Sequence, residues 1–263
     1  MKKTKSKKPN IGFCVGFQQG YEILKFVLTQ KHKINFVATC NGDDSIYRSK
    51  IEKLCLKNKI KLFQDLDGNE SHFISYLNEN NIDIVFLLWW PNIIKTKAIN
   101  SVKMGWINLH PSLLPYGRGK HGYFWSIVEN KPFGVSIHYI DDGIDTGPVL
   151  FQRKINVSFE DTGESLYSKS SKEIIKLFKE SYNQIITLNF SFKKQNNKNA
   201  TSHFAYEIDD KSNIDLNRKY KAMDLINLIR ARTFNDGPSI KVRKDNFDYY
   251  LKLKIEKIDK KEK

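Results

Sequence analysis

The sequence predicts an α/β protein whose sheet is covered by helices. Short apolar runs alternate along the chain with segments in which apolar residues recur at helical spacing. This alternation is typical of a parallel sheet with helices on its faces. Two later apolar runs are close enough in sequence to pair as antiparallel strands, so the predicted sheet is mixed.

The first half of the chain contains most of the parallel elements. Buried strands are predicted from their short apolar runs at residues 10–15, 34–40, 60–63 and 82–90. Helices are predicted between them at residues 21–32, 45–58 and 70–80. A short helix then leads to a strand at residues 105–110, which ends in a loop that contains Pro111 and Pro115.

The second half adds an antiparallel pair, a long helix and an extension. A helix is predicted at 121–130, and the runs at 133–141 and 148–157 alternate like a strand pair. An amphipathic helix is predicted at 165–188. Near the end, a helix around 223–234 precedes a hairpin-like segment at 239–255.

Composition along the chain suggests four parts. Residues 1–8 form a basic tail, and residues 9–192 form the main domain. Residues 193–202 are polar and low in hydrophobicity, which favours a linker. Residues 203–263 then form a small C-terminal extension of helix and β-hairpin.

The strong positive charge does not by itself predict a nucleic-acid partner. The 263 residues carry a formal net charge of +15, and clustered basic residues can neutralise phosphates. Much of the excess lies at the two ends of the chain, where frayed tails are common. The lysines at these ends are Lys2, Lys3, Lys5, Lys7, Lys8, Lys257, Lys260, Lys261 and Lys263.

Cysteine and apolar content predict a cytoplasmic protein without a metal site. Cys14, Cys40 and Cys55 show no spacing typical of metal ligands, and we expect reduced, buried thiols. The apolar run after Pro9 is too short for a secretory signal, and no segment approaches the ~20 apolar residues that span a bilayer.

Two polar motifs stand out against this background. The first, NLHPSLLP, covers residues 108–115 at the end of a predicted strand, and the second, DDGIDTGP, covers residues 141–148. Ligands in open α/β sheets bind beyond the carboxyl ends of the strands. Taken singly, Asn108 and His110 could simply satisfy nearby backbone groups on one side of a strand, and Asp145 could organise a turn.

Together the two motifs resemble the paired signature of the formyltetrahydrofolate-dependent formyltransferases. This resemblance covers residues 80–155 well and implies a Rossmann-like formyltransferase domain that uses 10-formyltetrahydrofolate and no metal. It places the family's catalytic residues on Asn108, His110 and Asp145. Asn108 would donate to the developing oxyanion, His110 would accept the amine's proton, and Asp145 would orient His110, directly or through water.

The same resemblance suggests a donor pocket formed largely by backbone groups. Its candidate residues follow the strand at 82–90 and lie at the start of the second motif: Trp89, Trp90, Pro91, Asn92, Ile140, Asp141 and Asp142. For the two tryptophans, plain core packing is the alternative. The Leu114–Pro115 bond resembles one that is often cis in relatives.

Acceptor contacts are expected in the loop before the helix at 121–130. Arg118, Lys120 and His121 precede a helix start, where backbone N–H groups favour anions. Arg118 and Lys120 could therefore meet a pyrophosphate, or they could form a solvated basic loop. The glycines near the N-terminus do not form a dinucleotide-binding motif.

The extension is similar to that of the sugar N-formyltransferases. This similarity implies an acceptor such as dTDP-4-amino-4,6-dideoxyglucose, a role in surface polysaccharide (O-antigen, lipopolysaccharide or capsule) synthesis, and a homodimer paired through the hairpin. A methionyl-tRNA formyltransferase of reduced size is the first alternative, and salt-dependent tRNA binding would favour it. A non-catalytic regulator that binds folate or sugar nucleotide is the second.

Overall fold

The computed structural model describes residues 8–40, 45–237 and 239–258, so most of the predicted basic tail lies outside the described residues. The chain forms two compact units. The first comprises residues 1–110, 136–152 and 174–195, and the second comprises residues 111–135, 153–173 and 196–263. The domain boundaries at 192 and 202 stay a prediction.

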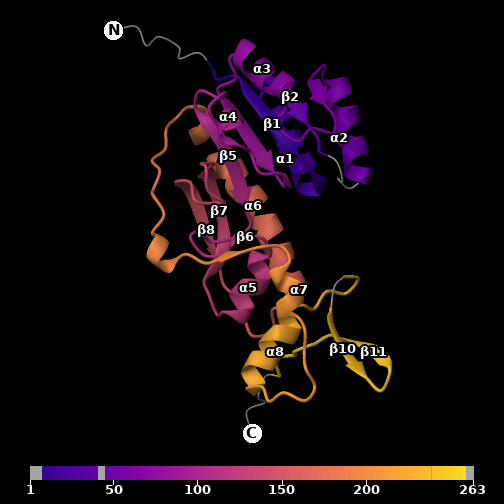
Figure 1. Cartoon of the computed structure of the whole chain (residues 1–263). Coiled ribbons are helices and arrows are strands. Elements are labelled where there is room, and N and C mark those ends of the chain that lie inside the picture. The colour runs from indigo at the N-terminus through magenta and orange to yellow at the C-terminus, as the bar shows by residue number, and fades with distance from the viewer. Residues whose placement is uncertain (1–7, 41–44, 238, 259–263) are drawn as a thin grey trace. The chain divides into compact units, whose positions relative to one another are not determined.

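A seven-stranded mixed sheet organises the first unit, as predicted (Figure 1). Its order is β3-β2-β1-β4-β5-β7-β8. The strands are β1 (Ile11–Val15), β2 (Ile34–Ala38), β3 (Lys61–Phe63), β4 (Ile84–Leu88), β5 (Gly105–His110), β7 (Phe133–Tyr139) and β8 (Val149–Ile155). Pairing from β3 through β5 is parallel, whereas β5 and β7 are antiparallel.

Helices pack on both faces of this sheet, which explains its continuously apolar strands. They are α1 (Phe17–Thr29), α2 (Ser45–Lys57), α3 (Ser71–Glu79), α4 (Thr96–Ile99) and the second half of α6 (Gly163–Ile186). On one face, Phe86 of β4 contacts Phe178 of α6, with ring centroids 5.4 Å apart. Helix α1 begins earlier than predicted, because its first turn contains polar Gln18 and Gln19, which break the apolar pattern.

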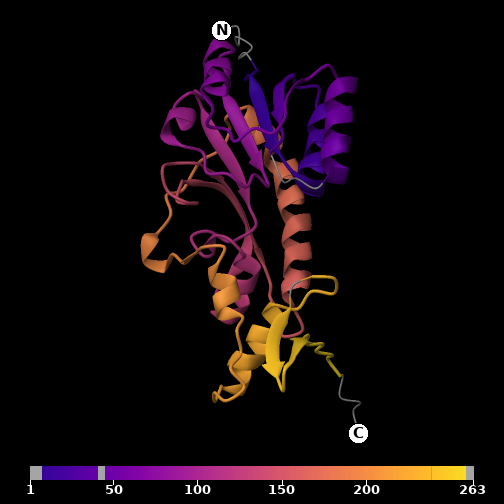
Figure 2. The same ribbon diagram turned by 45° about the vertical axis from the view of Figure 1, so that its right-hand side comes forward.

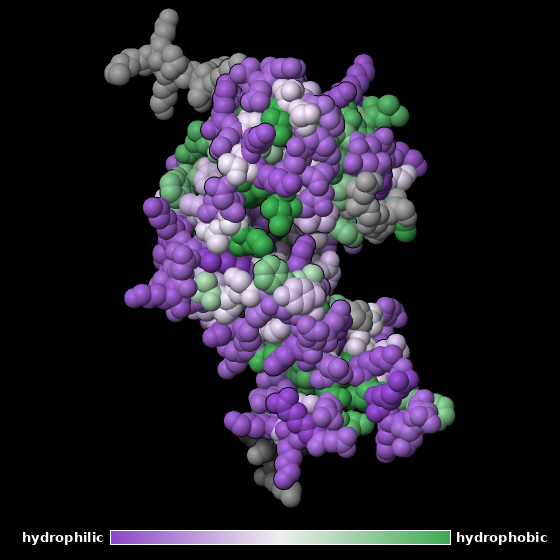
Figure 3. All heavy atoms as spheres, viewed as in Figure 1, coloured by the Kyte–Doolittle hydropathy of each residue, from purple (hydrophilic) through white to green (hydrophobic). Residues whose placement is uncertain are grey.

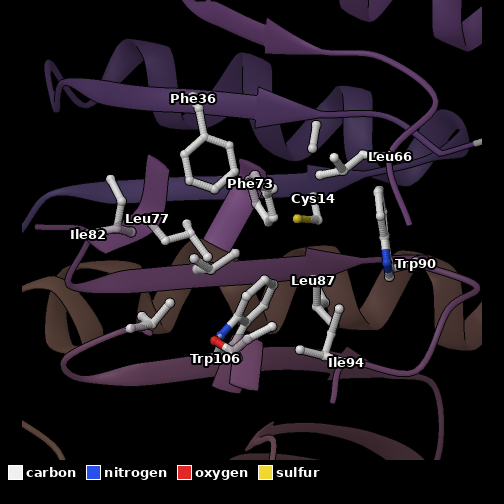
Figure 4. Packing of buried hydrophobic residues seen from close by; sticks show 14 of the residues in the cluster. Cys14, Phe36, Leu66, Phe73, Leu77, Ile82, Leu87, Trp90, Ile94 and Trp106 are labelled. Atoms are coloured by element: carbon white, nitrogen blue, oxygen red, sulfur yellow. Dashed lines mark hydrogen bonds between the residues drawn. The ribbon is translucent and has the colours of Figure 1, made fainter. Parts of the chain in front are cut away.

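The opposite face holds a buried cluster of aliphatic and aromatic side chains (Figure 4). Phe36 and Phe73 meet edge to face with centroids 5.3 Å apart, an arrangement that aromatic rings prefer. Cys14, Cys40 and Cys55 are buried thiols, as predicted. Burial raises the pKa of Cys14, and it raises the pKa of Cys55 to about 12, so these thiols stay protonated.

The second unit contains the predicted C-terminal helix and antiparallel hairpin. The helices are α5 (Gly122–Val128), the first half of α6, α7 (Glu207–Lys211), α8 (Ala222–Ala231) and the 3-10 turn η1 (Asn197–Asn199). The strands are β6 (Arg118–Gly119), β9 (Ser202–His203), β10 (Ile240–Lys244) and β11 (Phe247–Leu251). The hairpin β10–β11 lies beside α8 (Figure 2), and hydrophobic residues reach the surface over these elements (Figure 3).

A buried arginine fastens α8 to the loop before α6. Arg230 is 7% exposed, and its Nη1 donates to the backbone oxygens of Ser158, Phe159 and Asp161 at 2.8–3.2 Å. Asp161 is itself buried and accepts from Lys169 Nζ at 2.6 Å. These bonds satisfy backbone carbonyls that would otherwise be buried without partners.

The polar segment at 193–202 makes specific hydrogen bonds in both units. In the first unit, Lys193 exchanges two backbone hydrogen bonds of 2.8 Å with Val149. In the second, Thr201 Oγ1 accepts from the Gly117 backbone at 2.8 Å, and β9 pairs in parallel with β6. The two-residue strands β6 and β9 were not predicted, because two residues carry no periodicity.

Across the described part of the chain, no helix is long and apolar enough to cross a membrane. In the same residues, no group of three or more metal-ligating side chains could hold a metal ion.

Candidate active site

Strand β5 positions two of the three predicted catalytic residues on one side of the sheet. Asn108 and His110 alternate with buried Ile107 and Leu109, so their side chains share a face. The strand is fixed on both sides, because Asn108 lies opposite Leu87 of β4 and opposite His138 of β7. His110 is 6% exposed, so its imidazole is held in a largely dry environment.

The loop after β7 brings Asp145 to the same place. Asp145 has a φ of 53°, a left-handed conformation that aspartate tolerates better than most residues. Its Oδ2 lies 3.6 Å from His110 Nδ1, and its Oδ1 lies 3.4 Å from Asn108 Nδ2. The first distance is an electrostatic contact and is too long for a hydrogen bond. The structure thus brings together Asn108, His110 and Asp145, of which the first and the last are 37 positions apart in the sequence.

His138 belongs to this cluster and was not predicted. Its Nδ1 lies 2.7 Å from the carbonyl oxygen of Tyr139, which only accepts, so Nδ1 carries the hydrogen when the ring is neutral. Nε2 is then an acceptor, and it lies 3.2 Å from Asn108 Nδ2. The signal that could have found it is the alternation of polar Ser136 and His138 with apolar residues along β7, the strand that pairs with β5.

Gln195 holds the loop that carries Asp145, and it too was not predicted as a site residue. Its Nε2 donates to the carbonyl oxygens of Asp145 at 2.8 Å and of Gly147 at 2.7 Å. Gly147 is required for close approach, because a Cβ there would lie 1.9 Å from the carbonyl oxygen of Tyr139. A side chain from the predicted linker therefore shapes the loop beside the cluster.

The predicted donor residues fall in two loops of the first unit. Trp90 is 9% exposed, packs in the core cluster of Figure 4 and donates to the backbone of Asp67 at 3.3 Å, so its ring is largely structural. Trp89 is half-buried and has a left-handed φ of 57°. Pro91 is exposed, and Asn92 Nδ2 lies 3.4 Å from the oxygen of Asp67.

Residues 140–142 are bound into their loop mainly by their own side chains. Ile140 packs against the core cluster, and Asp141 Oδ1 accepts from the backbone of Gly143 at 3.2 Å. Asp142 Oδ1 accepts from Thr96 Oγ1 at 2.8 Å, which links this loop to the start of α4. The carboxylates of both aspartates thus help to shape the loop.

The predicted acceptor residues lie in the second unit. Arg118 is 6% exposed, and its Nη2 donates to Asn197 Oδ1 at 2.8 Å, whereas Lys120 is exposed. His121 occupies the N-cap position of α5 in a left-handed conformation, with a φ of 60°, and its side chain makes no capping hydrogen bond. Burial and the nearby cations of Arg232 and Lys120 lower the pKa of His121, so it is neutral at pH 7. The bond between Leu114 and Pro115 is cis, as the resemblance suggested.

Comparison with known proteins tests the resemblance directly. The family model described as formyl transferase matches residues 24–181, which is more than half of the chain. This chain belongs to the formyl transferase family. A second model, described as an N-formyltransferase dimerization C-terminal domain, matches residues 207–257, which include α7, α8 and the hairpin.

Among curated relatives of this formyl transferase chain is a methionyl-tRNA formyltransferase from Agathobacter rectalis. The two are 30% identical over 57% of this chain and 49% of the relative. The chain thus spans about half the length of that relative.

Solved structures resemble the chain over nearly its whole length. A sugar N-formyltransferase from Shewanella superposes with a TM-score of 0.82 at 19% identity, covering 95% of this chain and 99% of that one. WlaRD, a sugar 3N-formyl transferase solved with dTDP and 5-N-formyl-THF, superposes with a TM-score of 0.67 at 25% identity, covering 92% and 89%. The first likeness supports the fold.

The geometry of the cluster suits acyl transfer to an amine. Asn108 presents amide hydrogens, the type of donor that stabilises a developing oxyanion. His110 presents an imidazole that can act as a proton acceptor, and a carboxylate 3.6 Å away stabilises its charged form. The three groups therefore offer an oxyanion donor, a base and a charge partner within one face of the sheet.

Proposed function

We propose that this formyl transferase moves the formyl group of 10-formyltetrahydrofolate onto the primary amine of a nucleotide-linked amino deoxysugar. The observation that carries the proposal is the convergence of Asn108, His110 and Asp145 at the end of β5 and in the loop after β7. A family match over residues 24–181 supports the same reaction class.

In the proposed reaction, the amine nitrogen attacks the formyl carbon, and the carbonyl oxygen becomes an oxyanion held by Asn108. His110 takes the proton that the amine nitrogen loses, while Asp145 stabilises the imidazolium. The bond between the formyl carbon and N10 of the folate then breaks, and N10 receives a proton in exchange. The products are the formamido sugar and tetrahydrofolate.

For the folate, residues 89–92 and 140–142 supply the proposed binding surface. Trp89 is half-buried, which leaves part of an aromatic ring to meet the pterin. Because the carboxylates of Asp141 and Asp142 are bonded within the protein, we assign pterin binding in this loop to main-chain groups. WlaRD, which resembles this chain at 25% identity, was solved with a formyl-THF, in line with this assignment.

The sugar acceptor is favoured by the C-terminal part of the chain. Residues 207–257 match an N-formyltransferase dimerization domain, and the structures that superpose over more than nine-tenths of the chain include sugar N-formyltransferases. We propose dTDP-4-amino-4,6-dideoxyglucose as the acceptor, with Lys120 meeting its phosphates, His121 beside them and Arg118 ordering the loop. The enzyme would act in the cytoplasm, as a homodimer, in the synthesis of surface polysaccharide such as O-antigen or capsule.

A methionyl-tRNA formyltransferase is the second candidate, favoured by curated relatives that bear that name. An assay decides between them: the purified protein is given 10-formyltetrahydrofolate with amino-sugar nucleotides, glycinamide ribotide or charged initiator tRNA, and products are identified by mass spectrometry. We expect formylation of one amino-sugar nucleotide. Product from the tRNA alone would replace the proposed acceptor, and folate binding without any product would favour a regulatory role.

Replacement of the catalytic residues tests the mechanism. We expect His110→Asn and Asp145→Asn each to lower kcat by about 10²–10⁴, since each removes a proton acceptor or its charge partner. His72→Asn is the matched control, because His72 is exposed on α3. Near-normal turnover in His110→Asn, with an unchanged melting temperature, would refute the assigned roles.

A further inference from the structure

We infer that Phe204 and Tyr206 form a stacking platform that binds a nucleobase. The base belongs to the nucleoside diphosphate portion of the acceptor. This inference rests on the proposed function and deepens it, because it assigns a base-binding element to the nucleotide-linked acceptor. It concerns the second unit alone.

The two rings are stacked on each other and open to solvent. Their centroids are 5.9 Å apart and their planes differ by 5°. Phe204 is 55% exposed and Tyr206 is 64% exposed, so most of their surface is in contact with water. A planar base placed on the outer face of this pair would continue the stack, and base–aromatic stacking of this kind contributes substantially to nucleotide binding.

Several contacts anchor the backbone next to the platform. His203 immediately precedes Phe204, and its ring lies flat on Trp125 with centroids 3.7 Å apart and planes 8° apart. The two ring nitrogens of His203 lie 3.1 Å from Glu129 Oε1 and 3.0 Å from Glu207 Oε2. Glu207 Oε2 also accepts from the backbone nitrogen of Phe204 at 3.1 Å. Aromatic rings held rigidly at a surface lose little entropy when they bind.

A cation for the phosphates lies directly after the neighbouring strand β6. The backbone nitrogen of Lys120 donates to the carbonyl oxygen of His203 at 3.0 Å, which places exposed Lys120 next to the start of the platform. This close approach requires glycine at 119, where φ is 83° and a Cβ would lie 2.2 Å from the same carbonyl. Two nearby carboxylates are already paired, that of Glu207 with His203 and that of Asp209 with Arg232.

A protein partner is the competing occupant, and the comparisons argue against it. The match to a dimerization domain begins at residue 207 and so excludes both rings. The exposed aromatic residues of the hairpin lie within that match and provide the separate surface for a second copy. An aromatic pair beside a lysine instead fits a ligand with a planar ring and an anionic tail.

The test is calorimetric binding of dTDP and of inorganic pyrophosphate to the wild type and to the double variant Phe204→Ala/Tyr206→Ala. We expect dTDP affinity to fall about 5- to 150-fold in the double variant, since the base loses its stacking surface. Pyrophosphate affinity should stay at the wild-type value, because it has no base. Lys120→Ala should weaken both ligands, and Tyr206→Phe, which keeps the ring, should retain dTDP binding.

Steady-state kinetics with the amino-sugar nucleotide test the platform in the reaction itself. The acceptor KM should rise in the double variant, while the folate KM should not change. Phe192→Ala is the control, because it truncates an exposed ring in the first unit, and it should behave as wild type. Unaltered dTDP affinity in a double variant that still transfers formyl groups would overturn the platform and leave the proposed function standing. A wild type that formylates tRNA and binds no nucleoside diphosphate would overturn both assignments of the acceptor. A changed oligomeric state in the double variant with an unchanged acceptor KM would assign the rings to a protein contact.

Discussion

At the scale of single residues, the site depends on which atoms hold the hydrogens of Asn108. Asn108 Nδ2 lies 3.2 Å from His138 Nε2 and 3.4 Å from Asp145 Oδ1, and in the proposed reaction the longer contact, to Asp145, is exchanged for the oxyanion. His138 can accept only because its own Nδ1–H is bonded to the oxygen of Tyr139. His138 is therefore a positioning residue that sets the orientation of the amide proposed to bind the oxyanion.

Replacing His138 tests this role. In His138→Phe the ring remains but the acceptor is lost, and we expect kcat to fall about tenfold, the equivalent of one modest hydrogen bond. His138→Gln, whose amide oxygen can accept from Asn108, should recover part of the loss. The folate KM should not change, as measured by initial rates. Equal loss in both variants would point to a packing effect instead.

At the scale of elements, the loop between β7 and β8 determines where Asp145 lies. Its chain turns through Asp145, whose left-handed conformation needs support from surrounding groups, and through Gly147, which packs tightly against the carbonyl oxygen of Tyr139. Gln195 supplies that support through two hydrogen bonds to carbonyl oxygens of the loop. Gln195 is 50 residues away from Asp145 in the sequence.

We expect Gln195→Glu to disturb this loop more than Gln195→Ala. A carboxylate facing two carbonyl oxygens is repelled, whereas alanine leaves room for water to bridge them. Steady-state kinetics should show kcat lowered about tenfold or more in Gln195→Glu, with a smaller fall in Gln195→Ala. Gln184→Glu, on the exposed side of α6, is the control. If both Gln195 variants kept full activity, the hydrogen bonds from Gln195 to this loop would have no part in catalysis.

At the scale of the whole molecule, the hairpin exposes apolar surface that one chain does not cover. One face of the hairpin contains buried Ile240 and Val242. Tyr249 lies opposite Val242 and Phe247 lies opposite Lys244, so both rings point to this same face. Phe247 is nevertheless 66% exposed and Tyr249 is 49% exposed. Exposed aromatic residues beside a buried core are typical of an interaction surface. The dimerization-domain match covers this hairpin.

The proposed homodimer should therefore be weakened by charge on that face. Light scattering should give a mass of about twice the 30.7 kDa of one chain for the wild type. The double variant Phe247→Lys/Tyr249→Lys should give a mass closer to that of the monomer, because two lysines would have to be buried in the dimer interface. Tyr250→Lys is the control, since Tyr250 lies opposite Lys241 on the other face. An unchanged dimer in the double variant would place the contact elsewhere.

The strands of the seven-stranded sheet, the main helices and the three proposed catalytic residues can all be predicted from the sequence alone. Buried strands such as β4 are continuous apolar runs, so local composition alone reveals them. Asn108 and His110 are two positions apart on a strand, and period-two alternation places them on one face without knowledge of the fold.

Only the tertiary structure showed which distant groups meet. The segment at 193–202 is polar, which predicts a linker, yet Gln195 and Thr201 use that polarity to bond loops elsewhere in their own units. Likewise, the role proposed for His138 depends on its register opposite Asn108 in the sheet. The role proposed for Phe204 and Tyr206 depends on the stacking and exposure of their rings. Such contacts depend on long-range pairing, and residues far apart in sequence carry no local periodicity that would predict it.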